Sequence, residues 1–529
     1  MNYIEPVRIV EYKDCDRPEN MLIGNPCQKG FNGSKTMWLK RGGYIILDFG
    51  RELHGGISMA TMGVVNGVGN LRIVFGESVM EAKSTIGEKN ALNAHSMRDF
   101  VAQISSYSSA QPYGNTGFRF VKVEALDTDF DILTIKAYLV MRDLPRLGTF
   151  SSNDERLNHI WDTAVYTVQL NMQDYIWDGI KRDRDVWIGD MHPEVSTIRT
   201  VFGNVDVVKK SLDFVRDDTP EGQWMNGILT YSMWWIIIHY DLYMHYGDLA
   251  YLQQQKQCLT DTVNRIFEWI ENGYDFGKSF MFLDWSSHEK PDEQDGIKAV
   301  VAIALESASK MFLYLGEKEL SQKCMDCSQI LKAEKIEIET NRRVSSILEW
   351  AGKESPNSKK WVADSSPYEM SCFMGYYVLL AKAKAGDFKG AVDVIRSYWG
   401  AMLDMGATTF WEDFDIEWCE NAARIDEVTP EGKKDIHGDF GRYCYVGFRH
   451  SLCHGWASGP AAFLTETLAG IEILEPGCKK VKINPQLGGL EWYNITYPTP
   501  YGEISVKCRN KNGEAECEIS APAQIEIVR

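Results

Sequence analysis

The stretch SSNDERLNHIWDTAVYTVQL, residues 151–170, marks a change in the periodicity of the chain. Before it, from Tyr44 to about Val140, short runs of alternating apolar and polar residues lie between glycines, which predicts antiparallel strands in a β-sandwich. Within it, a Ser/Asn/Asp cluster typical of a helix N-cap precedes apolar side chains on one helical stripe, namely Leu157, Ile160, Trp161, Ala164, Val165 and Val168. We therefore expect a helical domain to follow an N-terminal β domain.

Glycine followed by an acidic residue interrupts the predicted helical region repeatedly. Three helices are expected to end within YGDLAYL, LGEKELS and AGDFKGA, at Gly247, Gly316 and Gly386, and FGNVDVVKKSL around Gly203 is a fourth such break. Glycine ends a helix in the left-handed conformation and an acid favours the start of the next helix, so each break predicts an αα-hairpin. The nearly equal spacing indicates repeated hairpins, stacked as a solenoid or closed as a toroid, and coincidental spacing in an ordinary helical domain is the alternative.

Alternation returns after LEPGCKKVKINP, where NITYP, GEISVKC and EAECEIS are typical of short strands. We therefore expect an N-terminal β-sandwich domain over residues 1–147, a helical domain over 148–472 and a small C-terminal β-sandwich domain over 473–529. The length of 529 residues agrees with several domains, because single cores stop growing at roughly 250–300 residues.

Composition narrows the classes of partner and location. A net charge of −18 argues against nucleic acid and against an anionic membrane surface, which both require a basic face. No apolar run reaches about 18 residues and no secretory signal begins the chain, so a cytoplasmic protein is expected. The one close cysteine pair, Cys324 and Cys327, has no second pair at zinc spacing, which favours free thiols over a metal or redox role. We expect no cofactor and no metal, and a homodimer is one expectation for the oligomeric state.

The stretch WDGIKRDRDVWIGD, residues 177–190, gathers four aspartates around two tryptophans. Charge runs of this kind are commonly an exposed helix face. The tryptophans inside the run and the Gly-Asp-Met-His-Pro sequence that ends it fit a regular surface helix poorly. The stretch is more typical of a loop at the mouth of a cavity, where irregular backbone directs several polar groups inward.

Two further segments have the composition of a reaction site. In GATTFWEDFD, residues 406–415, Glu412 lies beside Trp411, and an apolar wall raises the pKa of such a carboxyl; a surface carboxylate beside a core aromatic is the alternative. In RHSLCHGWASGP, residues 449–460, His454 precedes a helix-opening Gly-Pro. Two carboxylates with an imidazole and tryptophans are typical of a site that flanks a sugar with a general acid and a general base. A Ser/His/Asp triad ranks lower, because no Gly-x-Ser-x-Gly stretch occurs.

Taken in order, LDFGRELHGGI, LRIVFGES, the aspartate-rich stretch, GATTFWE and SLCHGWASGP resemble the α-L-rhamnosidases of glycoside hydrolase family 78. Each segment is weak alone, but the order is specific, and the resemblance runs from about Tyr44 to the end. It implies a multidomain α+β fold: a central (α/α)6 toroid of helical hairpins, flanked by an N-terminal β-sandwich and a small C-terminal β domain. It also implies an inverting glycoside hydrolase that releases terminal α-linked L-rhamnose from oligosaccharides or glycosides.

The resemblance assigns roles residue by residue. Glu412 matches the general base. The general acid of the family is a glutamate four positions before the Trp and seven before the Asp of W-x-G-D, and both counts lead to Asp183, where this chain has the shorter aspartate. Asp185 is the rival acid, and Arg182 either fixes the carboxylates or only balances their charge. The residues expected to bind substrate are Asp178, Arg182, Trp187, Asp190, Asp284, Trp285, Trp411 and His454.

Alternatives to this function stay open from the sequence. The toroid and the two-carboxylate plan also serve hydrolases of other hexosides and lyases that act on uronates, and an inactive relative would bind sugar without turnover. This chain also has one β module before the toroid, where many relatives have several, so its preference among glycosides can differ.

Overall fold

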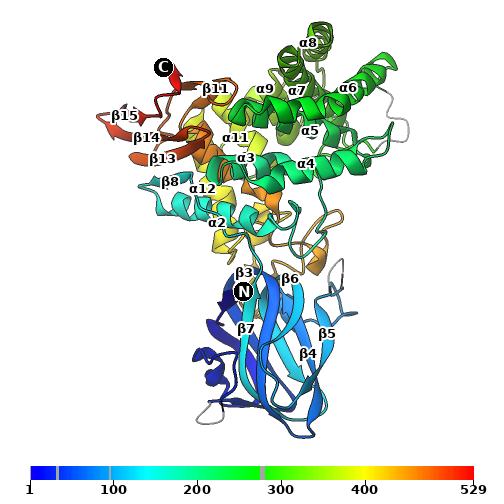
Figure 1. Cartoon of the computed structure of the whole chain (residues 1–529), viewed down its shortest axis with the longest axis vertical. Helices are drawn as coiled ribbons and strands as arrows, with labels where there is room; N and C mark the ends of the chain where they lie inside the picture. The colour runs from blue at the N-terminus through cyan, green and yellow to red at the C-terminus, as the bar shows by residue number, and fades with distance from the viewer. Residues whose placement is uncertain (1, 31–34, 94–96, 275–279, 529) are drawn as a thin grey trace.

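The computed structural model describes residues 2–30, 35–93, 97–274 and 280–528. They form an N-terminal sheet-rich domain, a domain of helical hairpins and a C-terminal sheet domain (Figure 1). In this view the N-terminal domain, in blue, lies at one end of the molecule, and the C-terminal sheet, in red, lies beside the helices at the other end. The α+β fold class predicted from the sequence is confirmed.

Antiparallel strands build the N-terminal domain, as the alternating pattern predicts. Within the described residues they form a 7-stranded sheet in the order β1-β7-β3-β6-β4-β5, with β2 paired to β3 off this path. Long strand β3 pairs with β2, β6 and β7 and so connects most of the domain. The strands are β1 (Asn2–Ile4), β2 (Arg8–Asp16), β3 (Met37–Val64), β4 (Val68–Gly76), β5 (Asp99–Ser105), β6 (Gln111–Ala125) and β7 (Phe130–Leu139), and helix α1 (Val79–Lys83) follows β4.

Helical hairpins form the middle of the chain, and each predicted glycine break lies between two consecutive helices. Gly247, Gly316 and Gly386 adopt φ values of 69°, 82° and 82°, the left-handed conformation that ends a helix. The helices are α2 (Glu155–Asn171), α3 (Met191–Val201), α4 (Asp206–Asp218), α5 (Leu229–Tyr246), α6 (Leu249–Glu271), α7 (Glu293–Tyr314), α8 (Lys318–Ala333), α9 (Arg342–Ala351), α10 (Ser358–Ala363), α11 (Met374–Lys384), α12 (Phe388–Asp404) and α13 (Gly459–Ala462). In the described part of the chain, no helix has both the length and the apolar character needed to cross a membrane.

After two of these glycines an aspartate caps the N-terminus of the next helix, as the sequence predicts. The side chain of Asp248 accepts the backbone N–H of Tyr251 at the start of α6, at 3.0 Å. Asp387 accepts the N–H of Gly390 at the start of α12, at 2.9 Å. Each cap satisfies a donor that the first helical turn leaves unpaired. The breaks therefore follow from local chemistry, which is why the sequence shows them.

The C-terminal domain incorporates a strand from the beginning of the helical region. Strand β8 (Thr149–Ser152), directly before α2, pairs with β13 in a sheet of order β15-β14-β13-β8 (Figure 1). A second, 3-stranded sheet has the order β11-β12-β16. The strands of this domain are β11 (Ile471–Glu475), β12 (Lys480–Ile483), β13 (Trp492–Thr499), β14 (Gly502–Lys511), β15 (Glu514–Ser520) and β16 (Glu526–Val528), and the short bridge strands β9 (Ala422–Ala423) and β10 (Lys434–Asp435) lie before them.

Irregular segments of the helical domain contact the N-terminal domain. The apolar core of the β domain includes Ile180, which belongs to the aspartate-rich stretch, and Cys453, which belongs to the SLCH segment. Both side chains have no exposed surface. Two of the three segments singled out in the sequence are thus anchored in the core of the neighbouring domain.

Candidate active site

The aspartate-rich stretch is a loop between α2 and α3, as the tryptophans and the Gly-Asp sequence predicted. Its shape depends on Asp178, whose carboxylate accepts the backbone N–H of Asp183 at 2.9 Å and that of Asp185 at 3.1 Å. A side chain that accepts nearby backbone donors in this way replaces the hydrogen bonds of a helix. The acid of lowest sequence number therefore orders the loop that presents the others.

The segments GATTFWEDFD and RHSLCHGWASGP meet this loop through backbone hydrogen bonds. Glu412 N–H donates to the carbonyl of Ser451 at 3.0 Å, and Gly455 N–H donates to the carbonyl of Asp178 at 2.8 Å. A glycine is required at 455, because a Cβ there would lie 1.7 Å from the Oε1 atom of Glu194. Residues more than 200 positions apart in the sequence are thus held as one unit.

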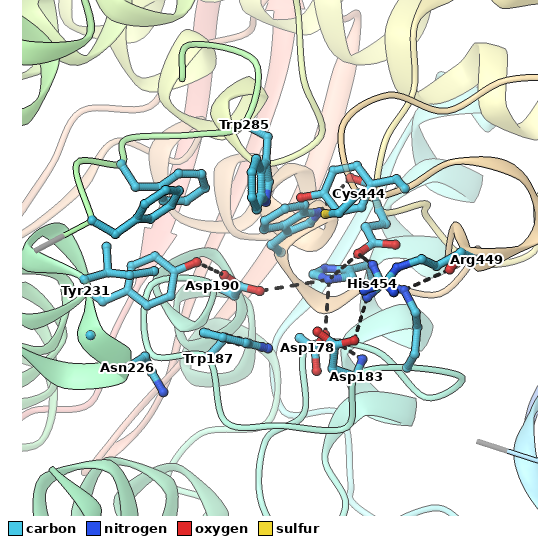
Figure 2. Close-up of a pocket in the computed structure, with 18 residues that line it drawn as sticks. Asp178, Asp183, Trp187, Asp190, Asn226, Tyr231, Trp285, Cys444, Arg449 and His454 are labelled. Carbon is cyan, nitrogen blue, oxygen red and sulfur yellow. Dashed lines mark hydrogen bonds and ion pairs between the residues drawn. The ribbon is translucent and has the colours of Figure 1, made fainter. Parts of the chain in front are cut away.

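These segments enclose a cavity of about 410 Å³ (Figure 2). In Figure 2, Trp285 lies on one side of the cavity, and Asp178, Asp183 and Trp187 lie on the opposite side. The cavity therefore has both charged and aromatic surface. Its lining consists of Asp178, Arg182, Asp183, Trp187, Asp190, Asn226, Gly227, Ile228, Tyr231, Phe280, Phe282, Trp285, Glu412, Cys444, Tyr445, Arg449, His454 and Trp456.

Arg182 connects the two carboxyls that the sequence assigns to the chemistry. Its Nη1 donates to Asp183 Oδ1 at 2.6 Å, and its Nη2 donates to Glu412 Oε1 at 2.5 Å. Its Nε donates to the carbonyl of Arg449 at 2.8 Å, which fixes the guanidinium plane. The side chain is 2% exposed. Of the two interpretations of Arg182, the structure shows direct fixing of the carboxylates.

His454 lies among three acids. Its Nε2 is 3.7 Å from Asp178 Oδ2, 3.7 Å from Glu412 Oε1 and 3.9 Å from Asp190 Oδ2. Burial lowers the pKa of an imidazole, but the close carboxylate of Asp178 and the charges of Glu412 and Asp190 outweigh it, so the pKa of His454 is raised. The raised pKa favours the protonated form of His454 where the acids converge. For Asp178, burial raises the pKa, yet His454 and the N–H of Asp183 bring the net pKa below its usual value.

Glu412 is buried, and its backbone and side chain are both held. Oε2 accepts the N–H of Ser451 at 2.9 Å, and the backbone carbonyl accepts Nε1–H of Trp456 at 3.0 Å. Burial raises the pKa of Glu412, while Arg182, His454 and the N–H of Ser451 each oppose part of that rise. The result is a carboxyl with a pKa above its ordinary value in a fixed orientation, which is the property of a general base that works near neutral pH.

Asp190 is a buried carboxyl of the cavity with a strongly raised pKa. Burial raises its pKa to about 8, partly offset by His454 and by the hydroxyl of Tyr231, which donates to Asp190 Oδ1 at 3.1 Å. Tyr231 packs directly on the loop at Gly189, where a Cβ would lie 2.1 Å from its ring. The glycine of W-x-G-D is therefore needed for Tyr231 to reach Asp190.

Most of the site residues expected from the sequence line the cavity. Those that do are Asp178, Arg182, Asp183, Trp187, Asp190, Trp285, Glu412 and His454. Asp284 and Trp411 lie outside the lining: Asp284 Oδ2 accepts Ser371 Oγ–H at 2.9 Å, and Trp411 is 1% exposed. Each is buried next to a lining residue, Trp285 and Glu412 respectively. The rival acid Asp185 is exposed and is not part of the lining.

Several lining residues were not expected from the sequence. Tyr231 belongs to α5, a mostly apolar helix without a distinct polar face, so nothing distinguished it from core. Cys444, Tyr445 and Arg449 lie in an irregular segment without periodicity. Arg449 is the first residue of RHSLCHGWASGP, and the sequence assigned no role to it. The remaining ones are Asn226, Gly227, Ile228, Phe280, Phe282 and Trp456, of which Trp456 lay in the quoted SLCH segment.

Fold and site together show a domain of helical hairpins whose connecting segments bring paired carboxyls into one cavity. Residues 145–333 match the model of the bacterial α-L-rhamnosidase six-hairpin glycosidase domain, and residues 470–528 match that of the bacterial α-L-rhamnosidase C-terminal domain. The resemblance stated from the sequence motifs is thereby confirmed.

Curated relatives agree with these matches. An α-L-rhamnosidase of Formosa agariphila is 21% identical over 94% of this chain and 56% of its own length. An α-L-rhamnosidase of Streptomyces avermitilis is 19% identical over 91% of this chain and 48% of its own length. This chain therefore spans about half the length of the curated relatives it matches.

Solved structures share the fold. The α-L-rhamnosidase from Dictyoglumus thermophilum superposes with a TM-score of 0.74 at 18% identity, covering 100% of this chain and 58% of that one. The rhamnosidase from Klebsiella oxytoca with rhamnose bound gives a TM-score of 0.66 at 20% identity, covering 88% of this chain and 95% of that one. The second comparison covers most of both chains, so the likeness of fold is not confined to one domain.

Proposed function

We propose that this protein is an inverting glycoside hydrolase that releases terminal α-linked L-rhamnose. The observation that carries the proposal is the placement of Asp183 and Glu412, from segments far apart in the sequence, on one cavity and on one guanidinium. The curated relatives and the domain models support the sugar, since all of those cited are α-L-rhamnosidases.

The proposed chemistry is a single displacement. The Asp183 carboxylic acid gives its proton to the glycosidic oxygen as the bond from the anomeric carbon to that oxygen breaks. Glu412 takes a proton from a water whose oxygen bonds to the anomeric carbon from the opposite face. Asp183 is left ionised and Glu412 protonated, and proton exchange with solvent restores both. The guanidinium of Arg182 between the two carboxyls keeps them from direct contact, as required if a water is to stand between the base and the sugar.

The remaining surface of the cavity fits a deoxy sugar. Asp178, Asp190 and protonated His454 present acceptors and donors for hydroxyl groups. Phe282 and Trp285 present apolar surface on which C–H faces and a methyl group pack. A 6-deoxyhexose has both kinds of surface.

A panel of aryl glycosides tests this proposal. We expect nitrophenol release from the aryl α-L-rhamnoside, with the β-anomer of rhamnose appearing first by proton NMR. Aryl hexosides and an aryl uronide are expected to react far more slowly, and the Glu412→Gln variant serves as the inactive control. Faster nitrophenol release from another aryl glycoside would show that rhamnose is not the preferred sugar. Initial formation of the α-anomer would overturn inversion, and sugar binding without turnover would identify a binding protein.

A further inference from the structure

Behind the cavity, two buried acids of the N-terminal domain meet a lysine of the aspartate-rich loop. Glu77 directly follows strand β4, and Glu81 lies in helix α1; both are 0% exposed. Ser78 caps that helix by accepting the N–H of Glu81 at 3.1 Å, and Glu81 Oε2 accepts the N–H of Glu77 at 2.8 Å. The second contact fixes the direction of the Glu81 carboxylate. Both carboxylates contact Lys181, the residue directly before Arg182.

Lys181 fills the position between these acids. Its Nζ lies 2.9 Å from Glu77 Oε2 and 3.3 Å from Glu81 Oε1. It also donates to the backbone carbonyls of Phe448 and His450, at 2.8 and 2.7 Å. Although Glu77, Glu81 and His437 converge closely enough to hold a metal ion, the lysine ammonium supplies the positive charge there. The cluster is therefore a junction between the β domain, the aspartate-rich loop and the SLCH segment.

Glu77 is connected to the proposed base through one peptide unit. Its Oε2 accepts the N–H of Leu452 at 2.6 Å. The preceding residue, Ser451, donates its N–H to Glu412 Oε2 at 2.9 Å and accepts the N–H of Glu412 at 3.0 Å. The amide that orients the base is thus held one residue away by a buried carboxylate of another domain.

The acid side of the site is tied to the same junction. Arg182, next to Lys181, donates to the carbonyl of Arg449 and to both Asp183 and Glu412. Because Arg182 is adjacent to Lys181 in the chain, the position of its guanidinium depends on the position of Lys181. Any displacement of the junction is transmitted to both carboxyls.

We propose that Glu77 of the N-terminal β domain, paired with Lys181, is a positioning residue for Glu412. It holds the Ser451–Leu452 peptide so that the Ser451 N–H stays directed at the base. This inference rests on the proposed function, because it assigns Glu412 the role of base. It makes the β domain part of the catalytic apparatus, although no side chain of that domain lines the cavity within the described residues.

The test compares Glu77→Gln with Glu52→Gln. Glu52 is a buried acid of the same domain, 2% exposed, whose Oε1 has no hydrogen-bond partner among the described residues; it acts on Glu77 and Lys181 through charge and so controls for the loss of a buried charge near the junction. For Glu77→Gln we expect kcat on the aryl α-L-rhamnoside to fall at least tenfold with little change in KM. We also expect the acid limb of kcat/KM to move to higher pH, because a weaker Ser451 N–H contact stabilises ionised Glu412 less. Glu52→Gln is expected to match the wild type in both measurements.

A second readout separates this inference from the proposed function. Amide hydrogen exchange of residues 448–456 is expected to speed up in Glu77→Gln and not in Glu52→Gln. If the wild type hydrolyses no glycoside, the proposed function fails while the exchange comparison still decides whether Glu77 holds the segment. Equal exchange and equal kcat in the two variants would overturn the inference. Should Glu77→Gln not fold, Lys181→Met is measured in the same way; it removes the counter-ion of Glu77 together with the donor to the carbonyls of Phe448 and His450, and is expected to change in the same direction.

Discussion

The two carboxyls of the proposed reaction lie in opposite surroundings. The Asp183 side chain is 18% exposed and belongs to a loop ordered by the nearby carboxylate of Asp178. The Glu412 side chain is 3% exposed and is held by Ser451 and Trp456, from a segment about 40 residues further along the chain. The surroundings of Asp183, here called the open side, are thus formed by local contacts and are partly exposed. The surroundings of Glu412, here called the closed side, are formed by long-range contacts and are buried.

This difference follows from the work that each group is proposed to do. A proton donor has to reach a leaving group that departs toward solvent, and it must be reprotonated after each turnover. A base has to hold one water in a fixed direction, and a buried, rigid carboxyl costs less reorganisation during the reaction. The contrast between the two sides can be tested by changing each one separately.

The largest expected effect is on the closed side. Replacing Glu412 by Gln keeps the shape and removes the proton acceptor, so kcat should fall by about 10²–10⁴-fold, and by a similar factor for aryl and alkyl rhamnosides. Steady-state kinetics on both substrates checks this. A loss confined to alkyl rhamnosides would assign Glu412 to the acid role instead.

On the open side, Asp183→Asn should depend on the leaving group. An alkyl alcohol needs the proton of Asp183 to depart, so hydrolysis of an alkyl rhamnoside is expected to fall by about 10²–10⁴-fold. An activated nitrophenol departs with little protonation and should be affected much less. Asp185→Asn is the matched control, because Asp185 is exposed two residues along, and near wild-type rates are expected. A larger loss in Asp185→Asn than in Asp183→Asn would exchange their roles.

The pH dependence of kcat/KM is expected to follow the ionisation of Glu412 on the closed side. Burial raises the pKa of Glu412 above its ordinary value of 4.5, and a base must be ionised to act. The rate should therefore decline on the acid side with an apparent pKa above 4.5. The pH profile of kcat/KM measures this limb. A profile that stays flat below pH 5 would contradict a buried ionisable base.

The smallest expected effect is on stability. Burial raises the pKa of Asp190 to about 8, so between the unfolded value near 3.9 and that value the folded protein binds more protons than the unfolded chain. Stability contributed by this group is therefore present at low pH and lost as the pH rises toward 8. Asp190→Asn should raise Tm by a few degrees at pH 8, and by less at pH 5, in thermal melts. A lower Tm at pH 8 would show that ionised Asp190 is stabilised by His454 more than burial opposes it.

The sequence predicts those features that local chemistry controls. Glycine followed by an acid marks the hairpin breaks because the cap and the left-handed residue are neighbours, as at Gly247 and Asp248. The loop character of the aspartate-rich stretch was predictable because Asp178 bonds to donors within seven residues. Local chemistry did not separate Asp183 from Asp185; the family resemblance did, through the distance of its acid to W-x-G-D.

Features that depend on long-range contacts were not predictable in this way. Tyr231 reaches Asp190 from a helix that has no distinct polar face in the sequence. Nothing in the sequence distinguishes Glu77 and Lys181 from other charged residues, because their contact forms only between the two folded domains. Asp284 fits the family pattern in sequence, yet its carboxylate accepts a hydrogen bond from Ser371 and does not line the cavity. A single sequence shows which residues have suitable chemistry, but not toward which neighbour each side chain turns.

The pairing of β8 with β13 has a consequence for synthesis of the chain. Thr149 and Thr496, partners in that pairing, are separated by 347 positions. At a synthesis rate of roughly 5–20 residues per second, β8 waits on the order of 20 to 70 s before its partner leaves the ribosome. During that interval it presents an unpaired strand edge to the cell. The four residues of β8 are short for an edge, which limits the opportunity for pairing with the wrong chain while the toroid in front of it is completed.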